Sequence, residues 1–357
     1  MASALGVGAV ALGVWAPKGP SMLGREQAGS GLSEFKRLEV KGYLNAVAWN
    51  KDSSHLAALS DYGHTITVWE SRNWSLINQF DRYSGGYSSN SLAYTADGML
   101  LTSAPVGKSS DPKYQTLAIF SLILWDPEAG RVIRYIPDPI PDTGFKIEDT
   151  DTYAVSPDGK LVAGIMQRGP NSPVLLFETA TWTLIGHFAV PPTPKHPDGA
   201  VCVAFSPDSR EIALGTLFGY VHVMAIGQET PRLSFSAYPD GVPCYAVAYS
   251  HNGRTLATGR GLVPLGAPDD GRTRLWRASD GVNLAFLNGG GAGVHNLSWS
   301  ETGLLAIAHD QSLAVWDAAE PTKPRMVLYN EGATYSVAFD KTGTLAAASG
   351  NEVELYK

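Results

Sequence analysis

The sequence has eight histidines and 34 carboxylate side chains, the residue types that most often serve as general acids, general bases and metal ligands. No two histidines stand at the H-x-H or H-x-x-x-H spacing of a metal site. His295, His309 and Asp310, together with Asp151, form the group whose chemistry is of interest, because an imidazole beside a carboxylate can act as a general base in hydrolysis. The fold has to bring these residues together.

Other chemical motifs fail on their spacing. Residues 107–109 (GKS) resemble the end of a phosphate-binding loop, but Thr102 stands where its first Gly is required and no helix is expected after it. Asp149 and Asp151 begin like a calcium loop, yet Tyr153 occupies the next ligand position. No G-x-S-x-G elbow is present. The sequence therefore predicts no cofactor and no metal site.

The elements that position the candidate residues come from an internal repeat. A four-residue apolar pattern leads into a polar turn in seven places: AVAW (46–49), SLAY (91–94), TYAV (152–155), CVAF (202–205), AVAY (246–249), NLSW (296–299) and SVAF (336–339). After turns such as TADG and SPDG come a second short strand, a third with a large residue near its end and, in most copies, a fourth. Each copy predicts a four-stranded antiparallel unit.

The seventh copy stops at Lys357 after its third strand, and its missing strand is found at the other end of the chain. Residues 35–40 (FKRLEV) stand in the register of a fourth strand relative to the first copy. Pairing them with the last three strands closes a ring and removes the open sheet edges. We expect an all-β, seven-bladed β-propeller of four-stranded antiparallel blades in residues 35–357, preceded by an apolar segment and linker in residues 1–34.

The repeat resembles the WD-repeat β-propeller family across residues 35–357. The resemblance is carried by two Trp-Asp dipeptides, at 125–126 and 316–317, and by the segments SDYGHTITVWE (60–70), DDGRTRLWR (269–277) and HDQSLAVWD (309–317). No Gly-His pair precedes a first strand, so the family's buried network of His, Asp and Ser/Thr is not expected in its usual form. The resemblance implies a divergent propeller that acts as a binding scaffold.

The longest connections all fall on one face of the predicted ring. Turns between first and second strands, and between third and fourth, lie on the face that we call the bottom; the remaining connections lie on the top. Long top loops favour a non-catalytic scaffold that binds a protein or peptide at its top face and channel mouth, although loop insertions also drift neutrally. The predicted partner-binding residues are Tyr83, Tyr87, Lys113, Tyr114, Asp138, Asp142, Glu148, Asp149, Lys195, His196 and Arg260. The acidic loop at 138–151 favours a basic partner.

A second hypothesis is an exported propeller enzyme, lactonase-like or hydrolase-like, with its site at the channel mouth. The repeat register places His295 and His309 near the top of the sixth blade's inner strands, beside Asp310, and Asp151 completes the candidate set. The alternative role for the two histidines is that of hydrogen-bonded polar side chains at a water-filled channel.

Composition excludes some functions and bears on location. The 27 basic and 34 acidic residues give a net charge of −7 without a basic run, so nucleic-acid binding is not expected. Cys202 and Cys244 are too few for a disulfide scaffold and are predicted to be buried thiols. The apolar stretch at 4–16 suits a signal-peptide core but is too short to span a bilayer. We expect export and no integral membrane segment; a cytoplasmic location, with Met22 as the first residue, is the alternative.

Overall fold

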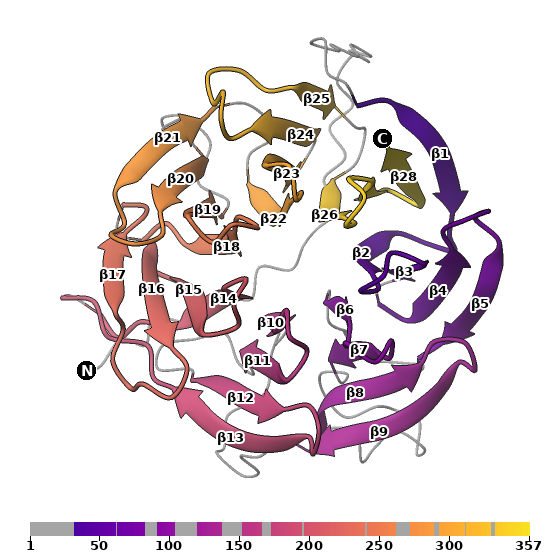
Figure 1. Cartoon of the computed structure of the whole chain (residues 1–357), viewed down its shortest axis with the longest axis horizontal. Helices are drawn as coiled ribbons and strands as arrows, with labels where there is room; N and C mark the ends of the chain where they lie inside the picture. Colours follow the sequence, from indigo (N-terminus) through magenta and orange to yellow (C-terminus); the bar gives the residue numbers. More distant parts are fainter. Residues whose placement is uncertain are drawn as a thin grey trace, which may run out of the picture.

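Seven sheets of four strands each are arranged radially around a centre (Figure 1). Every strand pairing within the sheets is antiparallel, and strands adjacent in the chain are adjacent in the sheet in six of the seven blades. The computed structural model describes residues 32–61, 63–82, 91–103, 120–137, 152–165, 173–194, 196–239, 241–261, 272–288, 293–310, 312–329 and 333–357. The predicted all-β fold with seven four-stranded antiparallel blades is confirmed.

The blades are named first to seventh in chain order, and their strands run from the centre outward. The first three are β2 (Leu44–Trp49), β3 (His55–Ser60), β4 (Thr65–Glu70) and β5 (Leu76–Asp81); β6 (Leu92–Tyr94), β7 (Leu100–Ser103), β8 (Phe120–Asp126) and β9 (Arg131–Pro137); and β10 (Thr152–Val155), β11 (Leu161–Ile165), β12 (Val174–Glu178) and β13 (Thr183–Phe188). The next three are β14 (Ala200–Phe205), β15 (Glu211–Thr216), β16 (Tyr220–Ala225) and β17 (Leu233–Ser236); β18 (Cys244–Tyr249), β19 (Thr255–Arg260), β20 (Thr273–Arg277) and β21 (Asn283–Leu287); and β22 (Val294–Trp299), β23 (Leu304–His309), β24 (Ser312–Asp317) and β25 (Met326–Tyr329).

The seventh blade joins the two ends of the described chain. It consists of β26 (Thr334–Phe339), β27 (Leu345–Ser349), β28 (Glu352–Tyr356) and, as its outermost strand, β1 (Glu34–Glu39). Ser33 and Lys357 exchange two backbone hydrogen bonds of 2.9 and 3.0 Å, which continue the pairing of β1 with β28. The closure predicted from residues 35–40 is therefore confirmed.

Apolar side chains are buried between neighbouring blades. Leu59 and Val68 of the first blade, for example, pack with Leu100 and Trp125 of the second. Each blade contributes one face to each neighbour, so its three inner strands are buried on both faces and their sequences are almost continuously apolar. The ring is thus held by a series of sheet-on-sheet contacts.

The repeated polar turns on the bottom face are explained by hydrogen bonds within the turns. In the third blade, the Ser156 hydroxyl donates to Asp158 at 2.6 Å and accepts the Leu161 amide at 2.9 Å. The Ser156 hydrogen bond lowers the pKa of the Asp158 carboxyl below its usual value. Gly159 ends the same turn with φ at +75°, where a Cβ would be strained. The recurrence of polar residues and Gly in these turns is therefore structural.

Indole nitrogens are paired with threonine hydroxyls inside two blades. Trp125 Nε1 donates to Thr102 Oγ1 at 3.0 Å in the second blade, and Trp276 Nε1 donates to Thr258 Oγ1 at 2.9 Å in the fifth. In the sixth blade, Ile307 takes the place of this threonine, and the buried Nε1 of Trp316 has no hydrogen-bond partner. The Trp–Thr hydrogen bond is therefore formed in the second and fifth blades and is absent from the sixth.

None of the described residues forms a helix that is long and apolar enough to cross a membrane.

Candidate functional site

The top ends of the innermost strands carry a repeated irregularity. In five blades the register between the first and second strands shifts at the strand's second residue. These bulged residues are Asn45, Val201, Tyr245, His295 and Tyr335. A β-bulge leaves one residue outside the ladder and redirects its side chain. The innermost strands surround the centre of the ring (Figure 1). The bulged residues stand near the start of these strands, at the end where the channel mouth was predicted, and Val201 among them is buried.

His295 and Asp310 form a hydrogen-bonded pair at this mouth. His295 Nε2 lies 2.6 Å from Asp310 Oδ1, and the two side chains are 28% and 21% exposed. His295 is at the start of β22 and Asp310 follows the end of β23, so the antiparallel pairing of these two strands places them side by side. The ring of Tyr335, from the next blade, lies 5.1 Å from the imidazole between centroids. A carboxylate that orients an imidazole in this way can position it as a hydrogen-bond partner or as a general base.

His309 does not share this exposed position. Its side chain is buried. Burial, followed by the nearby positive charge of Arg272, lowers the pKa of His309 to about 4, so the ring is neutral at neutral pH. Of the two histidines predicted at the channel mouth, only His295 is accessible.

The other predicted site residues divide into two groups. His196 is on the surface, where its ring stacks on Phe218 with centroids 5.0 Å apart, and Arg260 is buried at the end of β19. The remaining ones lie outside the described residues: Tyr83, Tyr87, Lys113, Tyr114, Asp138, Asp142, Glu148, Asp149, Asp151 and Lys195.

Three exposed tyrosines on the top rim were not predicted from the sequence. Tyr43, Tyr245 and Tyr335 are 63%, 39% and 41% exposed and belong to the first, fifth and seventh blades. With His295 of the sixth blade, they follow an arc of consecutive blades around the mouth. Gly261 lets the Tyr245 ring lie against the backbone, since a Cβ on Gly261 would be 2.7 Å from two of its ring atoms. We call these four residues the rim arc.

A positional signal for part of the rim arc was present in the sequence. Each bulged residue stands immediately before the four-residue apolar pattern of its blade, as Tyr245 does before AVAY and Tyr335 before SVAF. Among the residues at this variable position, the sequence predicted His295 and Asp151 as site residues but not Tyr245 or Tyr335. Asn90 and Asp151 hold the same position in the second and third copies and lie outside the described residues.

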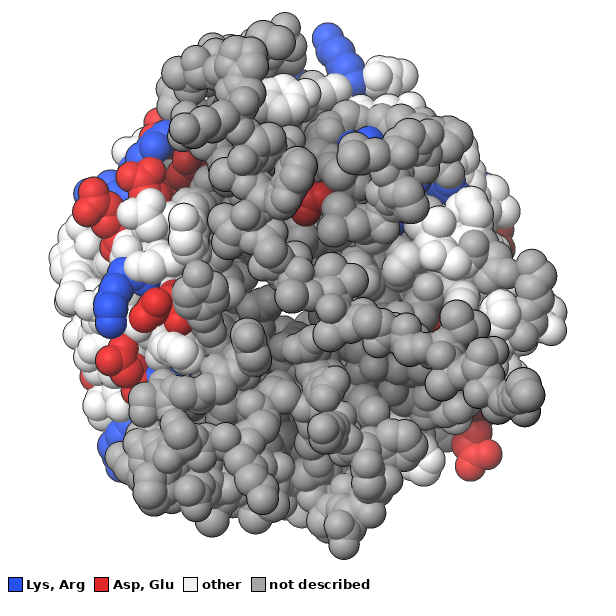
Figure 2. Space-filling model, turned by 180° about the vertical axis from the view of Figure 1, so that it is seen from behind, with Lys and Arg blue, Asp and Glu red and all other residues white. Residues whose placement is uncertain are grey.

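No group of three or more His, Cys, Asp or Glu side chains in the described part of the chain could hold a metal ion. In the view from behind the ring, acidic and basic side chains of described residues lie next to one another along the left edge (Figure 2). The aromatic and imidazole groups of the rim arc are therefore its distinguishing feature.

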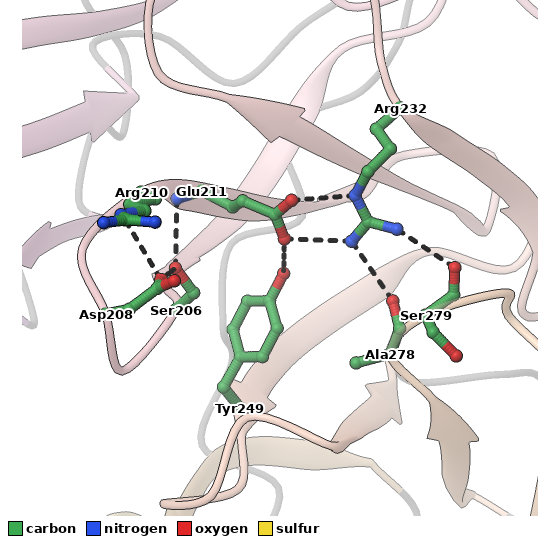
Figure 3. A network of polar contacts seen from close by, with 8 residues as sticks. All are labelled: Ser206, Asp208, Arg210, Glu211, Arg232, Tyr249, Ala278 and Ser279. Carbon is green, nitrogen blue, oxygen red and sulfur yellow. Dashed lines mark hydrogen bonds and ion pairs between the residues drawn. The ribbon is translucent and has the colours of Figure 1, made fainter.

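A polar network on the bottom face joins two neighbouring blades (Figure 3). The Arg232 guanidinium makes two hydrogen bonds to Glu211, of 2.7 and 2.9 Å, and two more to the carbonyl oxygens of Ala278 and Ser279 in the next blade. The Glu211 hydrogen bond raises the pKa of Arg232 above its usual value. This network connects the fourth and fifth blades and is structural.

The sheets and the rim define a closed seven-bladed β-propeller with an aromatic, histidine-containing channel mouth. The chain matches no model of a known protein family and no curated protein.

Proposed function

We propose that this propeller is a non-catalytic scaffold of the WD-repeat type that binds a protein or peptide at its top face and channel mouth. The observation that carries the proposal is the rim arc, in which Tyr43, Tyr245, His295 and Tyr335 present aromatic and imidazole rings to solvent on consecutive blades. The WD-repeat assignment is supported by the Trp-Asp dipeptides and by the two Trp–Thr hydrogen bonds inside the blades.

Tyrosine is well suited to such a surface. Its ring contributes a large contact area with only two side-chain torsions to immobilise, and its hydroxyl supplies a hydrogen bond. Tyr245 and Tyr335 stand on the innermost strands rather than on long loops, and Tyr335 is in contact with His295. Rigid placement reduces the ordering cost of binding, which favours affinity.

The partner that we propose is a basic protein or peptide. The acidic loop at 138–151, which the sequence predicts on the top face, lies outside the described residues. A basic segment would be oriented by this loop while its apolar side chains contact the rim arc.

The test is quantitative affinity purification from the native host with the Tyr245→Ala/Tyr335→Ala variant. A partner recovered with the wild-type protein should be lost or strongly depleted with this variant. The matched control is Tyr329→Ala, because Tyr329 is 58% exposed but lies on the outer strand β25. Equal recovery of the partner by the double variant and the control would contradict the proposal.

The hydrolase hypothesis has one observation in its favour, the 2.6 Å contact of His295 Nε2 with Asp310 Oδ1. In this alternative the Asp310 carboxylate would orient His295, which would take a proton from an attacking water. A hydrolase substrate panel, metal analysis of the purified protein and mass spectrometry of the mature N-terminus test it together. Turnover that is lost in His295→Ala but kept in His251→Ala would establish the enzyme in place of the scaffold.

A further inference from the structure

A hollow of about 450 Å³ lies on the bottom face, where the closing seventh blade meets the first. It is formed by the ends of strands that are far apart in the sequence. Phe35 comes from β1, Trp49 from the end of β2, Trp74 from the turn after β4, and Asp340 from the turn after β26. Its volume falls within the range of roughly 300–1,000 Å³ that is usual for small-molecule sites. Nothing in the proposed top-face function uses it.

Three aromatic rings form a corner of this hollow. The centroids of Trp49 and Trp74 are 6.0 Å apart with their planes at 69°, and those of Phe35 and Trp74 are 5.9 Å apart at 54°. Trp49 Nε1 donates to the Ala338 carbonyl oxygen at 3.1 Å, which fixes this indole against the seventh blade. All three rings therefore line one space, in which Trp74 contacts the other two at steep angles.

The charges around the corner favour a cation. Glu70, Asp52 and Asp340 contribute carboxylates to the lining. Asp340 is buried and its oxygens accept from Thr342 and Thr344, whereas the half-buried Glu70 carboxylate has no hydrogen bond or ion pair with any described residue. Among the described residues, no Lys or Arg side chain lies over any of the three rings. Two basic residues, Arg72 and Lys357, also line the hollow, but neither forms an ion pair with Glu70.

The backbone of Trp74 adopts a left-handed conformation that residues other than glycine disfavour. Trp74 has φ at 60°, and its amide donates to the Glu70 carbonyl oxygen at 2.9 Å. The same turn position in the second and fifth blades is Gly130 and Gly281, whose amides close equivalent turns. Glycine is the residue that this conformation favours, so Trp74 occupies a position where a side chain is disfavoured.

We infer that this hollow binds a small organic cation with a quaternary ammonium group, held by Phe35, Trp49 and Trp74 and balanced by Glu70. A quaternary ammonium cannot donate a hydrogen bond and is weakly hydrated, so aromatic faces attract it through their quadrupole. The carboxylate at the edge supplies the counter-charge. Arg72 and Lys357, which also line the hollow, are exposed to solvent and offer contacts to an anionic group on the same molecule.

Calorimetric titration of the full chain with choline, and with its uncharged carbon analogue 3,3-dimethylbutan-1-ol, tests the inference. The two molecules have the same shape, so only the charge distinguishes them. Choline should bind about tenfold more tightly, as expected for a cation–π contribution of about 1–2 kcal/mol. Equal affinities, or no binding of choline at millimolar concentration, would overturn the inference.

Two variants locate the binding. Trp74→Gly removes the central indole and leaves the residue that the turn conformation favours, so the variant should fold and bind choline at least about tenfold more weakly. Trp182→Gly is the matched control, because Trp182 occupies the same turn position in the third blade with φ at 57°. Glu70→Gln should weaken choline binding but not binding of the uncharged analogue. Unchanged choline affinity in Trp74→Gly, or equal losses in Trp74→Gly and Trp182→Gly, would refute the site.

Discussion

Protonation of one buried histidine should make this propeller sensitive to mild acid. The pKa of His309 is about 4 in the folded protein, against an ordinary value of 6.5, because the ring is buried and lies near the positive charge of Arg272. The folded protein therefore binds this proton less tightly than the unfolded chain. Protonation favours unfolding, so the contribution of His309 to stability is present above about pH 6.5 and is lost as the pH falls from about 6.5 to about 4.

The size of the effect follows from the difference between the two pKa values. A difference of about 2.5 pH units, at about 1.36 kcal/mol per unit, corresponds to about 3 kcal/mol when the pH is below both values. At pH 5 the unfolded chain is almost fully protonated at this site and the folded protein is not, so about 2 kcal/mol should already be lost relative to pH 7.5. This is a large fraction of the stability of an ordinary domain.

The assay is urea denaturation of the wild-type protein and of His309→Leu at pH 7.5 and pH 5. Between these pH values the free energy of unfolding of the wild-type protein should fall by about 2 kcal/mol more than that of His309→Leu. Carboxylates such as Asp158 titrate in both proteins and cancel in the comparison. His251→Ala, which replaces an exposed histidine in a bottom turn, should behave as the wild type. Parallel pH profiles for His309→Leu and the wild type would refute the reasoning.

Three further expectations concern the blade interiors. Thr258→Val should lower the free energy of unfolding by about 2 kcal/mol in urea denaturation, because the buried Trp276 Nε1 loses its acceptor. In a Trp276→Phe background the same substitution should lower the free energy of unfolding by less. Cys202 and Cys244 are both buried, so a thiol reagent should not react with them in the native protein and should label both after unfolding; labelling without unfolding would contradict this. Gly215→Ala should lower the melting temperature, since a Cβ there would lie 2.5 Å from Cys202 Sγ and 2.6 Å from the Cys244 carbonyl oxygen; an unchanged melting temperature would argue against this packing.

The repeat could be predicted because its signals are local. Strand and turn alternate within a few residues, and hydrogen bonds such as Ser156 to Asp158 fix each turn without help from distant parts of the chain. The ring closure could also be predicted, because an unpaired third strand at one end of the chain and a spare strand at the other leave one pairing that removes both edges.

The candidate site was predicted only in part. The proximity of His295 and Asp310 follows from the register of two adjacent strands, and the structure shows them 2.6 Å apart. The burial of His309 and the nearby charge of Arg272 do not follow from that register, because they depend on how the fifth and sixth blades pack together. The bulges could not be predicted from the sequence either, since one extra residue in a strand redirects Tyr245 or Tyr335 without changing the apolar pattern.

The sequence alone determined the architecture: strand content, blade number and closure follow from a periodic pattern of apolar residues and turns, and these are short-range properties. Only the tertiary structure decided which side chains meet. Phe35, Trp49 and Trp74 become the walls of one hollow because closing the ring places the seventh blade against the first. Such contacts depend on packing between residues from distant parts of the chain, which no local pattern records.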